Sequence, residues 1–166
     1  MVNIYKSLIR PHLEYCVQVW APVPQYGNWK HILDIENVQR RYTRLIDGVG
    51  LKSYQERLRC LNLTTLLERR ARGDLIETCE ILNGIANYGE NLFKRSTRGN
   101  NLLIRPNMYT KSQRGFLSSR VVGYWNKLPV TVKTPIEGKG EGITDHRGYQ
   151  KNMVNIFKNR LDSYWL

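Results

Sequence analysis

The 166-residue sequence is poor in acidic side chains and has no long apolar run. It holds 14 Asp and Glu against 26 Lys and Arg, so the formal net charge is +12 and the pI is near 9.8. No apolar stretch approaches the roughly 20 residues that cross a bilayer. The opening MVNIYKSLIRPHLEYC has charges inside its apolar pattern and does not match a secretory signal peptide. We therefore expect an intracellular protein, nuclear or cytoplasmic, that is not inserted in a membrane.

Cysteine and paired carboxylates are also scarce. The three cysteines are odd in number and widely spaced, which argues against a disulfide framework, and no Cys-x-x-Cys pair is present for zinc. The three histidines are far apart in sequence, and no two of the five aspartates are adjacent. Asp145 and His146 adjoin in a glycine-rich stretch without an evident nucleophile. We predict no catalytic, metal or cofactor site, and no enzyme activity of the chain on its own.

What the sequence does hold is positive charge on a chain able to fold. A hydrophobic content of 41% is too high for a disordered basic tail, and 166 residues suffice for one domain with a core. A net charge of +12 concentrates polyanions at the surface, and nucleic acid is the commonest such partner. The composition thus favours a nucleic-acid-binding domain.

The first half of the chain has helical spacing. Residues 2–20 are apolar at helical intervals but contain Pro11, which predicts two short helices or one kinked helix. After a connector at 21–27, a helix is expected over 28–47, with Ile35, Val38 and Tyr42 facing inward.

Two capping signals follow. Ser53 with Glu56 predicts the start of a short helix. Thr64 or Thr65 starts the next, long helix, with Glu68 three residues after Thr65.

The second half is more varied. Residues 87–115 predict a loop-rich segment with a hairpin, followed by a helix over 116–128. The stretch 137–148, EGKGEGITDHRG, predicts a flexible loop before a last helix over 150–165. The predicted fold is mainly α, a helical bundle with a loop-rich or small β-hairpin insertion and a C-terminal helix. We assign 1–88 to a helical part and 89–166 to a C-terminal part of one folded unit.

Four stretches in order resemble the region after the palm in LINE-type, jockey-like non-LTR retrotransposon reverse transcriptases. They are YKSLIRPHLEYCVQVWAP at 5–22, IENVQRRYTRLI at 35–46, LNLTTLLERRARGDLIETCEILNG at 61–84 and FLSSRVVGYWNKLP at 116–129. The ending FKNRLDSYW at 157–165 is similar to the ends of such reading frames. The resemblance covers nearly the whole chain.

The resemblance implies a helical, thumb-like segment that holds the template–primer duplex against a catalytic palm. The palm and its metal-binding aspartates are missing here, so the chain is similar to a fragment of an RNA-directed DNA polymerase. The glycine-rich stretch at 137–148 departs from the family, which passes more directly to the final helix. The implied partners are RNA, DNA or their hybrid, bound without sequence preference, and a reverse transcriptase palm domain.

Arginines are the candidate binding residues, because a guanidinium can pair with a phosphate in a forked geometry. Arg40 and Arg44 lie four residues apart on one helical face with Arg41 beside them, where the alternatives are a solvated basic face or pairing with Glu36. Several arginines also lie at the start of the long helix, where a positive charge interacts unfavourably with the helix dipole. This suggests that they have a negatively charged partner, either a bound anion or acidic side chains of the same chain. Further basic residues occupy the loop-rich segment. The full candidate set is Arg40, Arg41, Arg44, Arg69, Arg70, Arg72, Arg98, Lys111 and Arg114.

The aromatic residues are interpreted mainly as core. Trp20, Trp125 and Trp165 follow apolar helical patterns, so packing is favoured over base stacking, and Trp29 is left open. Two alternatives to nucleic-acid binding remain. One is a protein-interaction module that docks on a palm domain or an acidic partner, and the other is a retrotransposon relic without function.

Overall fold

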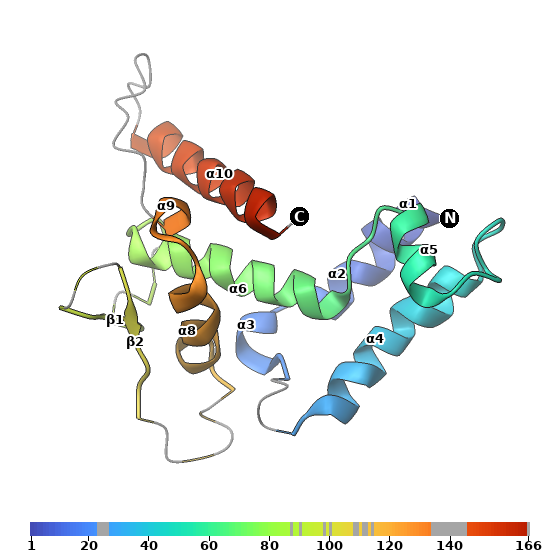
Figure 1. Cartoon of the computed structure of the whole chain (residues 1–166), viewed down its shortest axis with the longest axis horizontal. Coiled ribbons are helices and arrows are strands. Elements are labelled where there is room, and N and C mark those ends of the chain that lie inside the picture. Colours follow the sequence, from blue (N-terminus) through green and yellow to red (C-terminus); the bar gives the residue numbers. More distant parts are fainter. Residues whose placement is uncertain are drawn as a thin grey trace. The chain divides into compact units, whose positions relative to one another are not determined.

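The computed structural model is mainly helical, with one small antiparallel hairpin and a C-terminal helix, which confirms the predicted fold class. It divides into two compact units. The first comprises Met1–Arg72 and Met108–Leu117, and the second comprises Gly73–Asn107 and Ser118–Leu166. Figure 1 traces both along the chain. The structure describes residues 1–165 apart from 23–26, 87, 90, 98, 100, 108–109, 111–112, 114 and 134–145.

The first unit begins with a helical run that continues through Pro11. The run consists of α1 (Val2–Ile4), the π-helical turn η1 (Tyr5–Ile9) and α2 (Arg10–Glu14). Proline lacks a backbone donor, and its ring crowds the carbonyl four residues earlier. The wider π turn ends two residues before Pro11, in keeping with the space that the proline ring needs. Of the two predicted alternatives, a break at Pro11 is therefore absent from Val2–Glu14: the helical run continues past the proline and ends at Glu14.

A sharp turn then leads to three more helices of this unit. Cys16 adopts the left-handed conformation at φ 50° and starts α3 (Val17–Trp20). The predicted second helix is present as α4 (Trp29–Arg44), and α5 (Tyr54–Cys60) lies beside the C-terminal half of α4 in Figure 1. The capping box at Ser53 is formed as predicted: Ser53 Oγ accepts from the amide of Glu56, whose side chain accepts from the amide of Ser53.

The inward face of α4 differs from the prediction. Its buried residues are Ile32, Glu36, Gln39 and Thr43, whereas Val38 is exposed. These four residues also recur at three- and four-residue steps, so helical periodicity is preserved on a different face. Polar side chains can be buried there because each finds a hydrogen-bond partner from another part of the unit.

The long helix α6 (Leu66–Leu82) starts at the predicted capping box. The amide of Glu68 donates to Thr65 Oγ1 at 3.2 Å, and the amide of Thr65 donates to the Glu68 carboxylate at 3.0 Å. The division between the two units falls inside this helix, between Arg72 and Gly73.

The second unit contains the hairpin and the remaining helices. Strands β1 (Lys94–Arg95) and β2 (Leu103–Ile104) pair antiparallel, with Lys94 opposite Ile104. They precede α8 (Leu117–Lys127), close to the predicted 116–128, and α9 (Val130–Lys133), which was not predicted.

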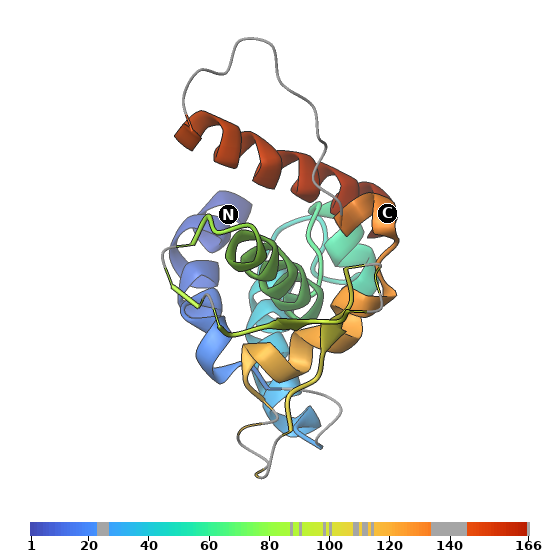
Figure 2. The same ribbon diagram turned by 90° about the vertical axis from the view of Figure 1, so that its left-hand side faces the viewer.

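The last helix, α10, runs over His146–Trp165. It starts four residues before the predicted position, so 146–148 of the predicted loop are helical, and the rest of that loop lies outside the described residues. Figures 1 and 2 both show α9 beside α10.

The core of the second unit is closed by aromatic packing and one ion pair. Trp125 stacks on Phe157 with ring centroids 5.9 Å apart, which joins α8 to α10. The Arg120 guanidinium donates to both carboxylate oxygens of Asp74 at 2.7 Å, and both side chains are buried. The side-chain amide of Asn126 hydrogen-bonds both backbone groups of Leu103 and so ties the hairpin to α8.

Candidate nucleic-acid interface

The arginine triad Arg40, Arg41 and Arg44 is exposed on the C-terminal half of α4. Arg41 and Arg44 occupy the last turn, where cations interact favourably with the negative end of the helix dipole. The suggested pairing with Glu36 on the same helix is not formed, since Glu36 is buried and its carboxylate accepts bonds from Tyr54 and Leu66. The three guanidiniums thus lie on the surface of the first unit.

Arg40 is held in place by an aromatic ring. Its guanidinium lies over the ring of Tyr54 with 4.7 Å between the guanidinium carbon and the ring centroid. Such a contact is worth about 0.5–1 kcal/mol at an exposed site. It restricts the long side chain without using the donor hydrogens of the guanidinium, which can still bind an anion.

Tyr54 is in turn fixed by a polar network buried in the first unit. Its hydroxyl donates to the Glu36 carboxylate and accepts from the Gln39 amide at 2.8 Å. Gln39 accepts from the Tyr5 hydroxyl at 2.6 Å, and the second carboxylate oxygen of Glu36 accepts from the amide of Leu66 at 2.9 Å. The network links the N-terminal run, α4, α5 and the start of α6. It holds α4 in position beneath the arginine triad.

Both tyrosines of this network have a raised pKa. Burial raises the pKa of Tyr5 well above its ordinary value of 10.0. Burial, followed by the hydrogen bond to Glu36, raises the pKa of Tyr54 in the same direction. Both hydroxyls therefore ionise only at a higher pH than an exposed tyrosine does.

Arg57 was not among the predicted site residues and has a structural role. It is buried on α5, and its guanidinium donates to Thr43 Oγ1 at 3.1 Å and to the carbonyl of Lys52 at 2.6 Å. A third, longer bond of 3.4 Å reaches the carbonyl of Arg40. Arg57 thus clamps α5 to the end of α4. Arg59, also on α5, is exposed and adds to the positive surface.

The predicted arginines at the start of α6 are less exposed than those of the triad. Arg69 is partly buried and forms a two-point ion pair with Glu14, one bond of which measures 3.2 Å. Arg70 is only 3% exposed, and Arg72 is partly buried. Of the remaining candidates, Arg98, Lys111 and Arg114 lie outside the described residues.

The positive charge is concentrated in the first unit. By sequence, that unit has 14 Lys and Arg against 6 Asp and Glu, a net charge of +8, whereas the second unit has 12 against 8, a net charge of +4. Because the units are similar in length, the field that attracts polyanions is stronger around the unit that bears the arginine triad.

The tryptophans divide between core and surface. Trp125 is 2% exposed, which confirms its predicted place in the core, but Trp20 and Trp165 are 42% and 41% exposed, so the prediction was wrong for both. Trp20 is the last residue of the short helix α3, which ends at the surface of the first unit. Trp29 is also exposed.

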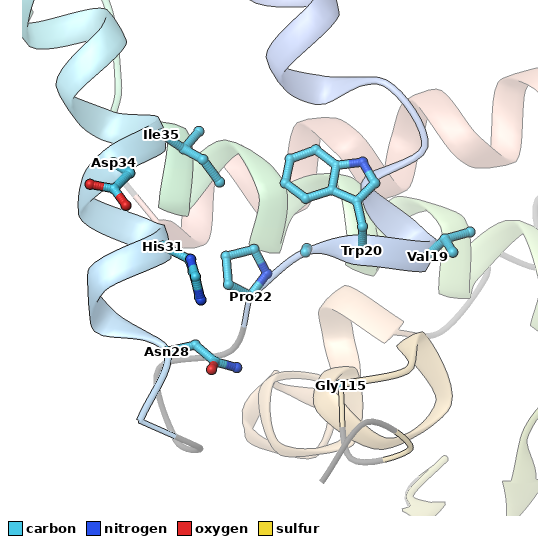
Figure 3. A pocket seen from close by; sticks show the side chains of 9 residues that line it. Val19, Trp20, Pro22, Asn28, His31, Asp34, Ile35 and Gly115 are labelled. Carbon is cyan, nitrogen blue, oxygen red and sulfur yellow. The ribbon is translucent and has the colours of Figure 1, made fainter.

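A hollow of about 470 Å³ opens beside Trp20 in the first unit. Figure 3 shows Pro22 between His31 and Trp20, with Ile35 above them and Gly115 below. Asn28 and Asp34 complete the polar part of its lining.

Two features are absent from the described part of the chain. Within those residues, His, Cys, Asp and Glu form no group of three or more that could hold a metal ion. None of the described helices is long and apolar enough to span a membrane.

Comparisons of the chain with protein-family models, with curated protein sequences and with solved structures give no match.

Proposed function

We propose that this chain binds the sugar–phosphate backbone of RNA, DNA or an RNA–DNA hybrid through Arg40, Arg41 and Arg44. The observation that carries the proposal is the exposure of all three guanidiniums on one half of α4, in the unit with a net charge of +8. Phosphate contacts of this kind supply affinity without reading sequence.

The resemblance to reverse transcriptases gives this binding a context. In that context, the chain is the thumb-like segment of a non-LTR retrotransposon polymerase and grips a template–primer duplex. The carboxylates that polymerisation needs belong to the palm, so the chain by itself binds nucleic acid without extending a primer.

Salt dependence tests the proposal directly. Binding of the chain to a fluorescently labelled RNA–DNA hybrid is measured by anisotropy at several salt concentrations. Each phosphate contact on a duplex contributes about −0.9 to the slope of log affinity against log salt. Replacing the triad by alanine removes up to three contacts and is expected to make the slope less steep by up to about 2.7.

A matched control separates local contacts from net charge. The variant Lys94→Ala/Lys127→Ala/Lys151→Ala removes the same charge from exposed positions of the second unit. It is expected to keep nearly the full slope. A flat salt response of the wild-type chain, or equal slopes for the two triple variants, contradicts the proposal.

A second candidate is supported by exposed apolar side chains on the N-terminal run. Ile4 and Leu8 are 53% and 63% exposed and lie four residues apart, hence on one face. Such a surface suits docking on a palm domain or another protein. Sedimentation velocity tests it: self-association at micromolar concentration that is lost in Ile4→Ser/Leu8→Ser supports docking, and a monomer at every concentration counts against it.

A further inference from the structure

We propose that the hollow beside Trp20 binds an unpaired nucleobase of the nucleic acid whose phosphates contact the arginine triad. The inference rests on the proposed function and extends it, because it adds a contact to a base where the triad contacts only the backbone. At about 470 Å³ the hollow falls in the size range of small-molecule sites.

The walls of the hollow suit a flat aromatic ring. Trp20 presents a partly exposed indole, and Pro22 and Ile35 add apolar surface nearby. The indole is already oriented, since its Nε1 donates to the carbonyl of Tyr15 at 2.6 Å. A fixed ring loses little conformational freedom when a base stacks on it.

The rim of the hollow suits the polar edge of a base. Asn28, His31 and Asp34 line it, and among the described residues their side chains make no hydrogen bond or ion pair. Asn offers both a donor and acceptors, neutral His offers one of each, and an ionised Asp only accepts. Nucleobases display the complementary amino and imino donors and ring acceptors on their edges.

Charge decides which part of a nucleotide enters. The carboxylate of Asp34 repels a phosphate but accepts from a base amino group. The surrounding unit, at +8, nevertheless attracts the polyanion as a whole. The base is therefore directed into the hollow and the phosphates toward the arginines.

The spacing along α4 allows one strand to make both contacts. Asp34 and Arg41 are seven residues apart, which places them on one stripe of the helix about 10 Å apart along its axis. A stacked strand advances about 3.4 Å per nucleotide. A base in the hollow thus leaves a phosphate about three nucleotides away at the level of Arg41.

An abasic strand separates base binding from backbone binding. Anisotropy is measured with a labelled oligodeoxyadenylate and with an abasic oligomer of equal length, which has the same phosphates. One stacked base is worth roughly 5-fold to 150-fold in affinity, so the wild-type chain is expected to prefer the intact strand by a factor in that range. Trp20→Ala is expected to bring the ratio close to one and to leave the salt slope unchanged.

Trp29→Ala is the matched control, since Trp29 is exposed on α4 and does not line the hollow. It is expected to retain the preference. Should Trp20→Ala fail to fold, the double variant His31→Ala/Asp34→Ala, at two exposed positions, is expected to lower the ratio about 5-fold.

Each remaining outcome counts against one proposal or both. Salt-dependent binding with equal affinity for the two strands overturns the base site and leaves the backbone proposal standing. A preference that survives Trp20→Ala, or the double variant where that is used, also overturns the base site. Failure to bind either strand at low salt overturns the proposed function and the base site with it.

Discussion

Replacing Glu36 by glutamine tests whether the buried network holds the first unit together. Glu36 is 6% exposed, and its carboxylate accepts from the Tyr54 hydroxyl and from the Leu66 amide at the start of α6. Glutamine has the same shape but only one accepting oxygen. If that oxygen serves Leu66, the Tyr54 hydroxyl meets an NH₂ group and loses its acceptor.

The magnitude follows from these two bonds. A hydrogen bond to a charged group contributes about 1.5–3 kcal/mol, and a neutral one about 0.5–1.5 kcal/mol. The variant loses one charged bond and converts the other to a neutral one. Relief of burying a charge offsets part of that loss. We expect Glu36→Gln to lower the free energy of unfolding by about 2–3 kcal/mol.

Urea unfolding followed by circular dichroism measures this change, and an unchanged m-value shows that the same surface is exposed on unfolding. Asp34→Asn is the matched control, because it makes the same chemical change at an exposed position of the same helix. It is expected to stay within about 0.5 kcal/mol of wild type. If Glu36→Gln is as stable as the control, desolvation outweighs the hydrogen bonds and the reasoning is wrong.

Three further predictions concern stability and use the same unfolding assay. Thr65→Ala removes the cap of α6 and is expected to lower the free energy of unfolding by about 1 kcal/mol. Thr64→Ala, at the neighbouring position, is expected to leave it nearly unchanged, and equal effects of the two variants contradict the capping role. Arg120→Met removes the guanidinium that pairs with the buried Asp74 carboxylate and is expected to lower the free energy of unfolding by about 3–5 kcal/mol. The double variant Asp74→Leu/Arg120→Met is expected to lower it by less than the single change. The raised pKa of Tyr5 contributes stability that is fully present below its ordinary value of 10.0 and falls above it, by up to about 1.4 kcal/mol per pH unit. The alkaline slope is expected to be shallower in Tyr5→Phe, and an unchanged slope contradicts this assignment.

Local signals in the sequence predicted most helices well. The capping boxes at Ser53 and Thr65 fixed two helix starts because both partners of each box lie three residues apart. Apolar spacing predicted α8 within one residue at each end. The start of α10 was missed because glycine near its beginning resembles a loop.

Non-local partners explain what could not be predicted. The buried face of α4 is polar because the partners of Gln39 include Tyr5, 34 residues earlier in the chain. Arg69 pairs with Glu14 across 55 residues, a separation that helical spacing does not reveal. The triad is exposed as predicted, although the predicted inward face of α4 was wrong: Val38 is exposed and the buried face is the polar one. A stripe of Glu36, Gln39 and Thr43 at helical spacing was the available signal for the polar face.

The π turn at Tyr5–Ile9 makes the number of residues between Tyr5 and Pro11 important. A π turn holds about one residue more than an α turn, so it shifts the residues before it by about 100° relative to those after Pro11. Tyr5 donates to Gln39 in this register, and we expect the bond to depend on the extra residue. Deleting one residue between Tyr5 and Pro11 would restore regular α-helix while turning the tyrosine away from its partner. The number of residues in this turn, more than their identity, therefore decides whether Tyr5 faces Gln39.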